Sequence, residues 1–241
     1  MTLLLRISAP RLLIIVLMLF ISACSQTPVL KVTLESEQNW DWRQQQLANI
    51  DEWEIHARAA IMVGAKSTQS GGFASDLALD KVYPVGITWS RQQAHFSMVI
   101  EAPFGQGVIR IESNLSTDKD KQFKLTLADG NFRLGATPDG LLVQLLGWRI
   151  PVTGLKSWIK GLPQPDVESN YEIDGLGRLK SLQQNGWFVN YLDYFPAQKQ
   201  VQQLPKRLYL KHNNVGIKIV IERWEKFEAQ AEQESIFPNF D

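Results

Sequence analysis

The stretch that decides the fold runs over residues 96–127 and reads FSMVIEAPFGQGVIRIESNLSTDKDKQFKLTL. Apolar residues alternate with polar ones three times in it, over 96–101, 108–112 and 123–127. A period of two residues places alternate side chains on opposite faces of a β-strand. The stretch therefore predicts three antiparallel strands that share one dry face.

The same period of two begins near Trp53 and continues through most of the chain. Asp174-Gly175 and Asn185-Gly186 are turn signals between strands. The pattern predicts about ten strands, enough for a sheet to curl into a barrel or half-barrel. The two C-terminal hairpins that we expect join residues 178–184 with 187–194, and 207–211 with 217–222 around Asn213-Asn214.

A helix is expected before the strands. Ser36 can cap a segment that runs to about Ile50, and Trp40 and Leu47 fall at helical spacing in it. Arg43 is expected on the side that faces water. The pattern is typical of a surface helix that lies on a sheet.

Two further helices are expected between the strands. Thr137 and Pro138 suit the cap and the first position of one helix, which Gly147 ends. A shorter helix is expected over 151–160, with Gly161 as its cap. A sheet with one dry face must bury that face, so these apolar helices are the expected lid over an apolar interior.

The first 24 residues carry an export signal. An apolar run over 12–21 is too short to span a bilayer comfortably, and small residues lead from it to Cys24. This junction resembles the lipobox of bacterial lipoproteins, after which residues 1–23 are removed and Cys24 is acylated. The uncharged Ser25 resembles the default for sorting to the outer membrane of Gram-negative bacteria. The alternative is an N-terminal anchor that stays uncleaved.

Composition excludes several classes of protein. Without residues 1–23 the chain keeps 218 residues, with 23 basic and 25 acidic side chains, so the charge indicates no nucleic-acid partner. Cys24 is the only cysteine, which excludes an intramolecular disulfide. No later apolar run approaches the roughly 20 residues needed to cross a membrane, so we expect a soluble body on a tether.

The sequence gives no indication of catalysis. It contains no Gly-x-Ser-x-Gly elbow, no His-Glu-x-x-His motif and no phosphate-binding glycine loop. His56, His95 and His212 are isolated from one another, and each lies in or beside a strand pattern, where a structural or surface histidine is the commoner case. We therefore expect no enzyme, no catalytic residue, no metal and no cofactor.

Eight tryptophans accompany the expected elements. Their rings could line a cavity inside a curled sheet, or they could fill an ordinary core, as aromatic side chains commonly do. Composition leaves both possibilities open.

The loop over 102–107 is unusual because Phe104 occupies its middle, where a turn normally carries a polar residue. The ring either tucks back onto the body or protrudes. A protruding ring would be an apolar finger for a membrane or a partner.

Six parts of the sequence carry a family resemblance: the lipobox, Trp42-Arg43-Gln44, Pro103-Phe104-Gly105, Leu146 to Pro151, Trp158 to Pro163, and Gln184 to Trp187. Together they resemble the LolB family of outer-membrane lipoprotein receptors. The resemblance implies a fold that is mainly β with helices (α+β), a single unclosed antiparallel β-barrel of about eleven strands with helices plugging an apolar cavity. It also implies that the protein accepts mature lipoproteins from the periplasmic carrier LolA and inserts them into the outer membrane.

The resemblance implies specific roles for residues of this chain. Cys24 would hold the lipid that anchors the protein in the outer membrane, on its periplasmic side. Pro103, Phe104 and Gly105 would form the membrane-insertion loop; the family usually has a protruding leucine at the position of Phe104. We expect a monomer. The residues on the dry faces that we expect to line the acyl-chain cavity are Trp89, Phe96, Met98, Ile100, Phe123, Leu125, Leu142, Leu145, Trp148, Trp158, Trp187 and Tyr191.

The expected organisation has four parts. Residues 1–23 are the signal peptide, 24–35 the lipidated cysteine and a flexible tether, and 36–224 one LolB-like half-barrel domain. Residues 225–241 carry five acidic residues and one lysine and are an expected disordered tail.

Two other kinds of protein would fit the same pattern. A lipocalin-like lipoprotein that binds a small hydrophobic ligand also needs a β-barrel with an apolar interior, but it does not need the Phe104 loop. A scaffold protein of the cell envelope would show an exposed apolar patch and no cavity.

Overall fold

The computed structural model describes residues 32–64, 79–103, 107–114, 118–196 and 203–229, which belong to one compact unit. Its helices are α2 (Leu34–Ala48), α3 (Pro138–Leu146), α4 (Val152–Trp158) and the short 3-10 helix η2 (Lys119–Lys121). Its strands are β1 (Ile50–Gly64), β2 (Leu79–Gln92), β3 (His95–Glu101), β4 (Val108–Ser113), β5 (Phe123–Leu127), β6 (Phe132–Gly135), β7 (Ser169–Ile173), β8 (Leu179–Gln184), β9 (Trp187–Tyr194), β10 (Pro205–His212) and β11 (Val215–Ala229).

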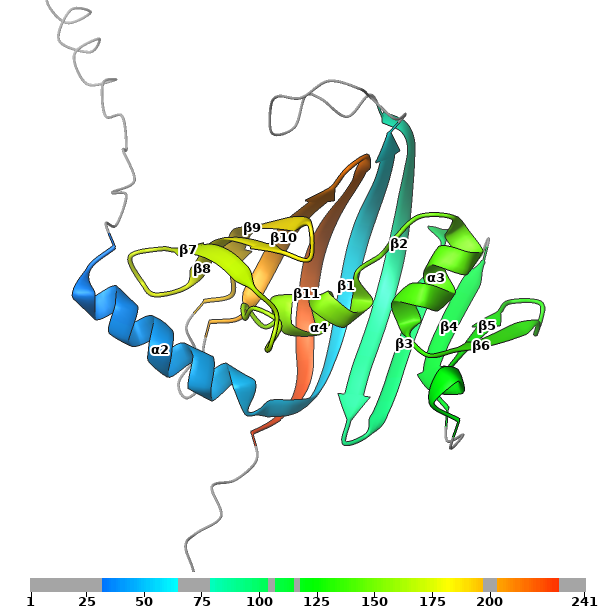
Figure 1. Cartoon of the computed structure of the whole chain (residues 1–241), viewed down its shortest axis with the longest axis horizontal. Helices are drawn as coiled ribbons and strands as arrows, with labels where there is room; N and C mark the ends of the chain where they lie inside the picture. Colours follow the sequence, from blue (N-terminus) through cyan, green and yellow to red (C-terminus); the bar gives the residue numbers. More distant parts are fainter. Residues whose placement is uncertain (1–31, 65–78, 104–106, 115–117, 197–202, 230–241) are drawn as a thin grey trace, which may run out of the picture. The chain divides into compact units, whose positions relative to one another are not determined.

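All eleven described strands form one antiparallel sheet in the order β6-β5-β4-β3-β2-β1-β11-β10-β9-β8-β7 (Figure 1). The edge strands β6 and β7 do not pair with each other, so the sheet is not closed. The expected fold class, mainly β with helices on an unclosed sheet of about eleven strands, is confirmed.

The centre of the sheet is β1, which pairs with β2 on one side and with β11 on the other. Its residues alternate between two environments: Ile55 and Ile61 are buried, whereas Arg58 between them is exposed. On the neighbouring strands Met98 pairs with Ile111, which pairs with Leu125, and all three are buried. The dry face expected from the alternation over 96–127 is therefore confirmed.

Both expected C-terminal hairpins are present. β8 pairs with β9 around Asn185 and Gly186, and β10 pairs with β11 around Asn213. Asn185, Gly186 and Asn213 all have positive φ angles, the backbone conformation that such tight turns require. The turn residues therefore predicted these pairings correctly.

The first helix differs from its expected form at both ends and on one face. Thr33, not Ser36, is the N-cap: the Ser36 N–H donates to Thr33 Oγ1 at 3.3 Å, and the Thr33 N–H donates to Ser36 Oγ at 2.7 Å. The helix ends at Ala48, and Ile50 begins β1. The expectation that Arg43 faces water is wrong, because only 4% of this residue is exposed.

The two middle helices lie in front of the sheet (Figure 1). α3 begins and ends as expected, with Thr137 Oγ1 accepting the Gly140 N–H at 3.1 Å and Gly147 in the left-handed conformation. α4 is shorter than the expected 151–160. Leu142 and Trp158 pack in the same core cluster as the dry face of the sheet, so the helices bury that face.

The last strand extends beyond its expected end. β11 continues to Ala229, so the boundary expected at Trp224 falls inside a strand. Residues 230–241 lie outside the described part of the chain, as do Cys24, the rest of 1–31, and the loop residues 104–106.

Candidate functional site

An apolar cavity lies between the dry face of the sheet and the segment that leads through α4. Its volume is about 40 Å³. All the described residues that line it are apolar. The segment through α4 lies over this face of the sheet, and we call it, together with α3, the cover. It lines the cavity with Ile150, Val152, Leu155 and Ile159. The lining residues from the sheet are Ile55, Ala57, Ala59, Ile61, Val85, Ile87, Trp89, Met98, Ile100, Ile217 and Ile219.

The cavity exists because side chains are short where the sheet and the cover face each other. Ala57 and Ala59 occupy the middle of β1, between the larger Ile55 and Ile61. Leu155 of α4 lines the cavity from the opposite side. Two alanines cannot reach across the distance that isoleucine side chains fill, so a space remains between the layers.

A row of aromatic rings crosses the sheet at one end of this cavity. Ring centroids are 5.9 Å apart for Trp224 and Trp53, 4.9 Å for Trp53 and Trp89, 5.9 Å for Trp89 and Phe96, and 5.6 Å for Phe96 and Phe123. The rings meet edge to face, a favourable aromatic geometry. We call these five residues the aromatic floor.

An open groove begins at the other end. It has a volume of about 390 Å³ and shares two lining residues, Val85 and Ile100, with the cavity. The Ala102 N–H donates to the Gly107 carbonyl at 2.9 Å, which fixes the base of the loop between them. The other described lining residues are Ala102, Gly107, Val108, Ile109, Leu127, Ala128 and Asp129.

The C-terminal end of α4 is bound to the sheet by buried polar groups. Gln184 Oε1 accepts from Trp158 Nε1 at 2.9 Å and from the Gln164 N–H at 2.8 Å, while Gln184 Nε2 donates to the carbonyls of Gln164 and Val167. The Tyr191 hydroxyl donates to the Trp158 carbonyl at 3.1 Å, and burial raises the pKa of this phenol. These bonds hold one end of the cover in place.

The N-terminal ends of α3 and α4 are joined to each other. Asp139 in the first turn of α3 accepts hydrogen bonds from the Thr153 N–H at 2.9 Å and from Thr153 Oγ1 at 2.6 Å. One carboxylate thus caps the second helix from the first, so the two helices form one unit.

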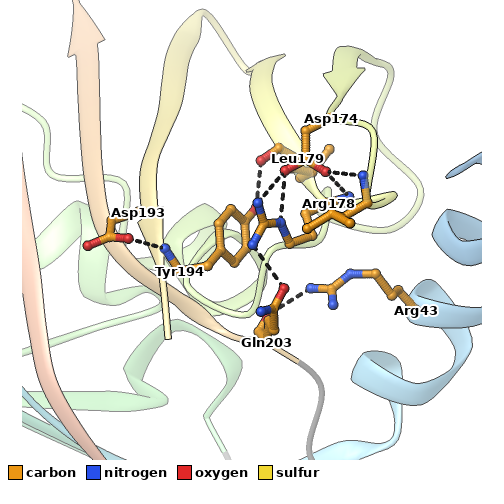
Figure 2. A network of polar contacts seen from close by, with 8 residues as sticks. Arg43, Asp174, Arg178, Leu179, Asp193, Tyr194 and Gln203 are labelled. Carbon is orange, nitrogen blue, oxygen red and sulfur yellow. Dashed lines mark hydrogen bonds and ion pairs between the residues drawn. The ribbon is translucent and has the colours of Figure 1, made fainter. Parts of the chain in front are cut away.

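A polar network attaches the first helix, α2, to the residues just before β8 and β10 (Figure 2). Arg43 Nη2 donates to the Gln203 carbonyl at 2.7 Å, and Arg178 Nη1 donates to Gln203 Oε1 at 2.9 Å. Arg178 also pairs with Asp174 at 2.6 Å and lies over the Tyr194 ring, 4.6 Å from its centroid. Burial lowers the pKa of Arg43 and raises that of Tyr194.

A buried lysine supports the start of β1. Lys160 Nζ donates to the Ile50 carbonyl at 3.1 Å, and only 8% of the residue is exposed. The pKa of Lys160 is lowered to about 8, chiefly by burial; the nearby Asp51 opposes this lowering, and Lys156 and Arg91 contribute to it.

The three histidines lie on three different strands, His56 on β1, His95 on β3 and His212 on β10. The described part of the chain contains one group that could hold a metal ion, formed by Glu54, His56 and Glu225, whose ligand atoms lie within 4.8 Å of one another. Glu225 is also paired with Arg223, a cation that would compete with a metal. His212 stacks on Trp187, a structural role.

The structure places the expected cavity residues in three groups. Trp89, Met98 and Ile100 line the cavity. Leu125, Leu142, Trp158, Trp187 and Tyr191 are buried in the core, and Phe96, Phe123, Leu145 and Trp148 pack partly buried against it; none of these nine is among the lining residues. Pro103 is half-buried at the end of a described segment, and Phe104, Gly105 and Cys24 lie outside the described residues.

Sequence reasoning missed most of the actual lining. The alternation of Ile55, Ala57, Ala59 and Ile61 around the exposed Arg58 was available as a signal, because a period of two puts these four residues on one face. The prediction selected mainly large side chains as cavity-lining residues. Large side chains fill space, whereas a cavity remains where side chains are small.

The fold and the site define a class of protein: a mainly β protein whose open sheet carries helices over an apolar interior. The sequence pattern of the family described as "Outer membrane lipoprotein LolB" matches residues 51–224. The chain belongs to this family.

Relatives of this chain in Pseudomonas species bear the same name. The chain is 30% identical over 188 residues to the outer-membrane lipoprotein LolB of Pseudomonas paraeruginosa, covering 78% of this chain and 81% of the relative. It is 30% identical to that of Pseudomonas syringae over 77% and 80%, and 29% identical to that of Pseudomonas aeruginosa over 78% and 81%.

Among solved structures, a DUF1329 family protein from Desulfovibrio piger matches with a TM-score of 0.42 at 7% identity, over 83% of this chain and 95% of the other. This score is too low to establish a common fold. Within the described ranges, every helix is too short or too polar to cross a membrane.

Proposed function

We propose that this protein is a lipid-anchored receptor of the outer membrane that accepts mature lipoproteins from LolA and inserts them into that membrane. The observation that carries the proposal is a cavity with only apolar described lining, under a helical cover, in a chain of the LolB family. Such a lining offers no hydrogen bond to a headgroup or a peptide, but it suits the acyl chains of a lipoprotein.

The energetics of the cargo require a receptor of this kind. At roughly 0.8 kcal/mol per CH2 group, exposing three acyl chains to water costs on the order of 30 kcal/mol. The chains must therefore pass directly from one apolar site to the next. A receptor takes them when its cavity binds them better than the carrier does, and the bilayer takes them last.

The cavity has to widen during this transfer. Its volume of about 40 Å³ is far below the roughly 300–1,000 Å³ of sites that enclose a ligand. Because Asp139 joins α3 to α4, and Gln184 holds the far end of α4, we expect the helical cover to swing as one unit about the Trp158 end.

Two residues outside the described part of the chain complete the proposed function: one anchors the receptor in the membrane, and one delivers the cargo to the lipid. Acylation of Cys24 would hold the receptor, as a monomer, on the periplasmic face of the outer membrane. Phe104 would enter the interface of the bilayer and bring the site to the lipid. The apolar character that it shares with leucine supports this role.

A transfer assay tests the proposal. A form that starts at Ser25 is mixed with LolA preloaded with a labelled lipoprotein, and liposomes are then added. We expect wild type to strip the cargo from LolA and deliver it, Phe104→Glu to strip it without delivery, and Phe104→Leu to behave as wild type.

Two results would count against the proposal. If no form takes cargo from LolA, a lipocalin-like carrier of a small hydrophobic ligand becomes the better explanation. If Phe104→Glu delivers cargo as fast as wild type, the role of the loop is wrong.

A further inference from the structure

We propose that the groove between Ala102 and Asp129 holds an acyl chain and is the passage by which such chains enter and leave the cavity. This inference rests on the proposed function and adds a location to it. The groove and its occupant are argued from four features of the described residues.

The first feature is continuity. Val85 of β2 and Ile100 of β3 line both the cavity and the groove, so the two spaces are adjacent and are divided at these positions by single side chains. Ala102, two residues beyond Ile100, lines only the groove. A chain that lies in the groove therefore needs only a movement of these side chains to reach the cavity.

The second feature is the closed opposite end. Trp53 on β1 and Phe96 on β3 are each two residues beyond a cavity-lining residue, Ile55 and Met98, and both belong to the aromatic floor. Trp53 is 1% exposed and Trp89 is 2% exposed. Large rings in edge-to-face contact leave no passage for a methylene chain between them. The methyl end of a chain would stop there.

The third feature is chemistry. Asp129 is the one charged residue among the described residues of the groove. Its carboxylate accepts from the Asn131 N–H at 2.9 Å and from Asn131 Nδ2 at 2.7 Å, so it is turned to the β5–β6 turn. The remaining surface is aliphatic and matches a saturated chain.

The fourth feature is size. The groove measures about 390 Å³, within the range of sites that hold a ligand of some tens of atoms, whereas the cavity measures about 40 Å³. An acyl chain can therefore occupy the groove while the cover is still closed. Contact with the groove comes first, and the cavity widens afterwards.

Gly107 provides a direct test, because a Cβ at this position would meet no atom within 4 Å and its backbone is not among the positive-φ glycines. Gly107→Leu therefore places a larger side chain at the groove, and its Cβ meets no neighbouring atom. The matched control is Gly86→Leu: Gly86 lies between Val85 and Ile87 on β2, so its side chain would project from the other face, 3.9 Å from Glu101 Cβ.

The measurement is the affinity of each form for dansylaminoundecanoic acid, followed by fluorescence. The form that starts at Ser25 serves, because all the described residues, which lie between 32 and 229, belong to one compact unit. Displacing about two CH2 groups from the groove weakens binding about tenfold. We expect that loss for Gly107→Leu and wild-type affinity for Gly86→Leu.

A second measurement tests whether the groove is occupied without placing a large side chain in it. Cys24 is the only cysteine, so the form that starts at Ser25 has no thiol, and Gly107→Cys or Gly86→Cys introduces a single one. Alkylation by N-ethylmaleimide is followed with and without palmitate. Palmitate should protect the thiol at position 107 and leave the one at position 86 reactive.

The outcomes separate the two proposals. If wild type binds the probe but the thiol at position 107 is not protected, the groove is not the passage, and the receptor function is unaffected. If wild type binds neither the probe nor lipoprotein, both proposals fail. If Gly107→Leu loses its near-ultraviolet circular dichroism, the thiol measurement alone decides.

Discussion

Asp174 shows how one residue can attach a helix to a sheet. Its carboxylate pairs with Arg178, and Arg178 and Arg43 both contact Gln203, which links α2 to the segment before β10 (Figure 2). The side chains of Asp174 and Arg178 are only 26% and 21% exposed. A pair that is largely removed from water loses more than its attraction when one partner is neutralised, because the remaining charge is left poorly solvated.

We therefore expect Asp174→Asn to lower the free energy of unfolding by about 2 kcal/mol. The matched control is Glu172→Gln on β7, two residues before Asp174. The side chains of Glu172 and its partner Lys180 are 65% and 67% exposed, so this pair should contribute less than about 0.5 kcal/mol. Urea unfolding of both variants gives the comparison. Equal losses would show that the burial of the network has no energetic consequence.

Lys160 makes stability depend on pH in the alkaline range. Its pKa is about 8 in the folded protein and 10.5 in a solvated lysine, so between these values the unfolded chain binds more protons than the folded one. Stability therefore rises as pH increases from about 8 to 10.5, by up to about 3 kcal/mol.

Lys160→Met should remove this rise and stabilise the protein near neutral pH, since no buried charge remains to be desolvated. The exposed Lys180→Met serves as control and should keep the slope. Thermal unfolding across this pH range measures both. A slope that survives in Lys160→Met would assign it to other groups.

At the scale of elements, predictability follows the range of the determining contacts. α3 was predicted well because Thr137, Pro138 and Gly147 act within one or two turns of the helix. The burial of Arg43 was not predicted, because its partner Gln203 is distant in sequence. From sequence alone, a polar residue on a helix is predicted to face water. Its burial can be recognised only when the structure shows the polar group with which it pairs.

α2 also depends on a close backbone approach at Gly177. A Cβ there would lie 2.5 Å from the Ser36 carbonyl oxygen and 2.8 Å from the Trp40 nitrogen, and the φ angle of +68° is unfavourable for other residues. Gly177→Ala should therefore cost about 3 kcal/mol. Gly107→Ala, which meets no neighbour, should change stability by less than about 1 kcal/mol.

Chemical unfolding measures the two alanine variants, and hydrogen exchange of α2 shows whether the loss is local. If Gly177→Ala unfolds as wild type does, the helix can dock without this close approach.

At the scale of the whole molecule, the sequence predicted the open sheet and the dry face but not the position of the cavity. Strand periodicity identifies a face, whereas an empty space is defined by what two layers fail to fill. Ala57 and Ala59 line that space, whereas Trp158 and Trp187, which were expected to line it, are not among its lining residues. The position of Leu155 across the space from the sheet is a property of the assembled layers.

A larger side chain in the cavity should abolish the binding of acyl chains while lowering the stability of the protein only moderately. Ala59 lines the cavity and pairs with Val85 and Ile219, and the next residue, Ala60, projects from the opposite face. Ala59→Leu should abolish uptake of lipoprotein from LolA at a cost of about 1–3 kcal/mol in stability. Ala60→Leu should leave uptake unchanged, and normal uptake by Ala59→Leu would mean that chains are bound elsewhere.

The strand order has a further consequence, for when the molecule can be assembled. Every pair of neighbouring strands is consecutive in the chain except β1 and β11. Their pairing, for example Ile61 with Ile217, closes a loop of about 150 residues, and contacts of such high order make folding slow. The export signal predicted for residues 1–23 would deliver β1 first, and β1 would lack one of its two partners until β11 had followed. The contact that completes the sheet is thus the last one that a chain delivered from its N-terminus could form.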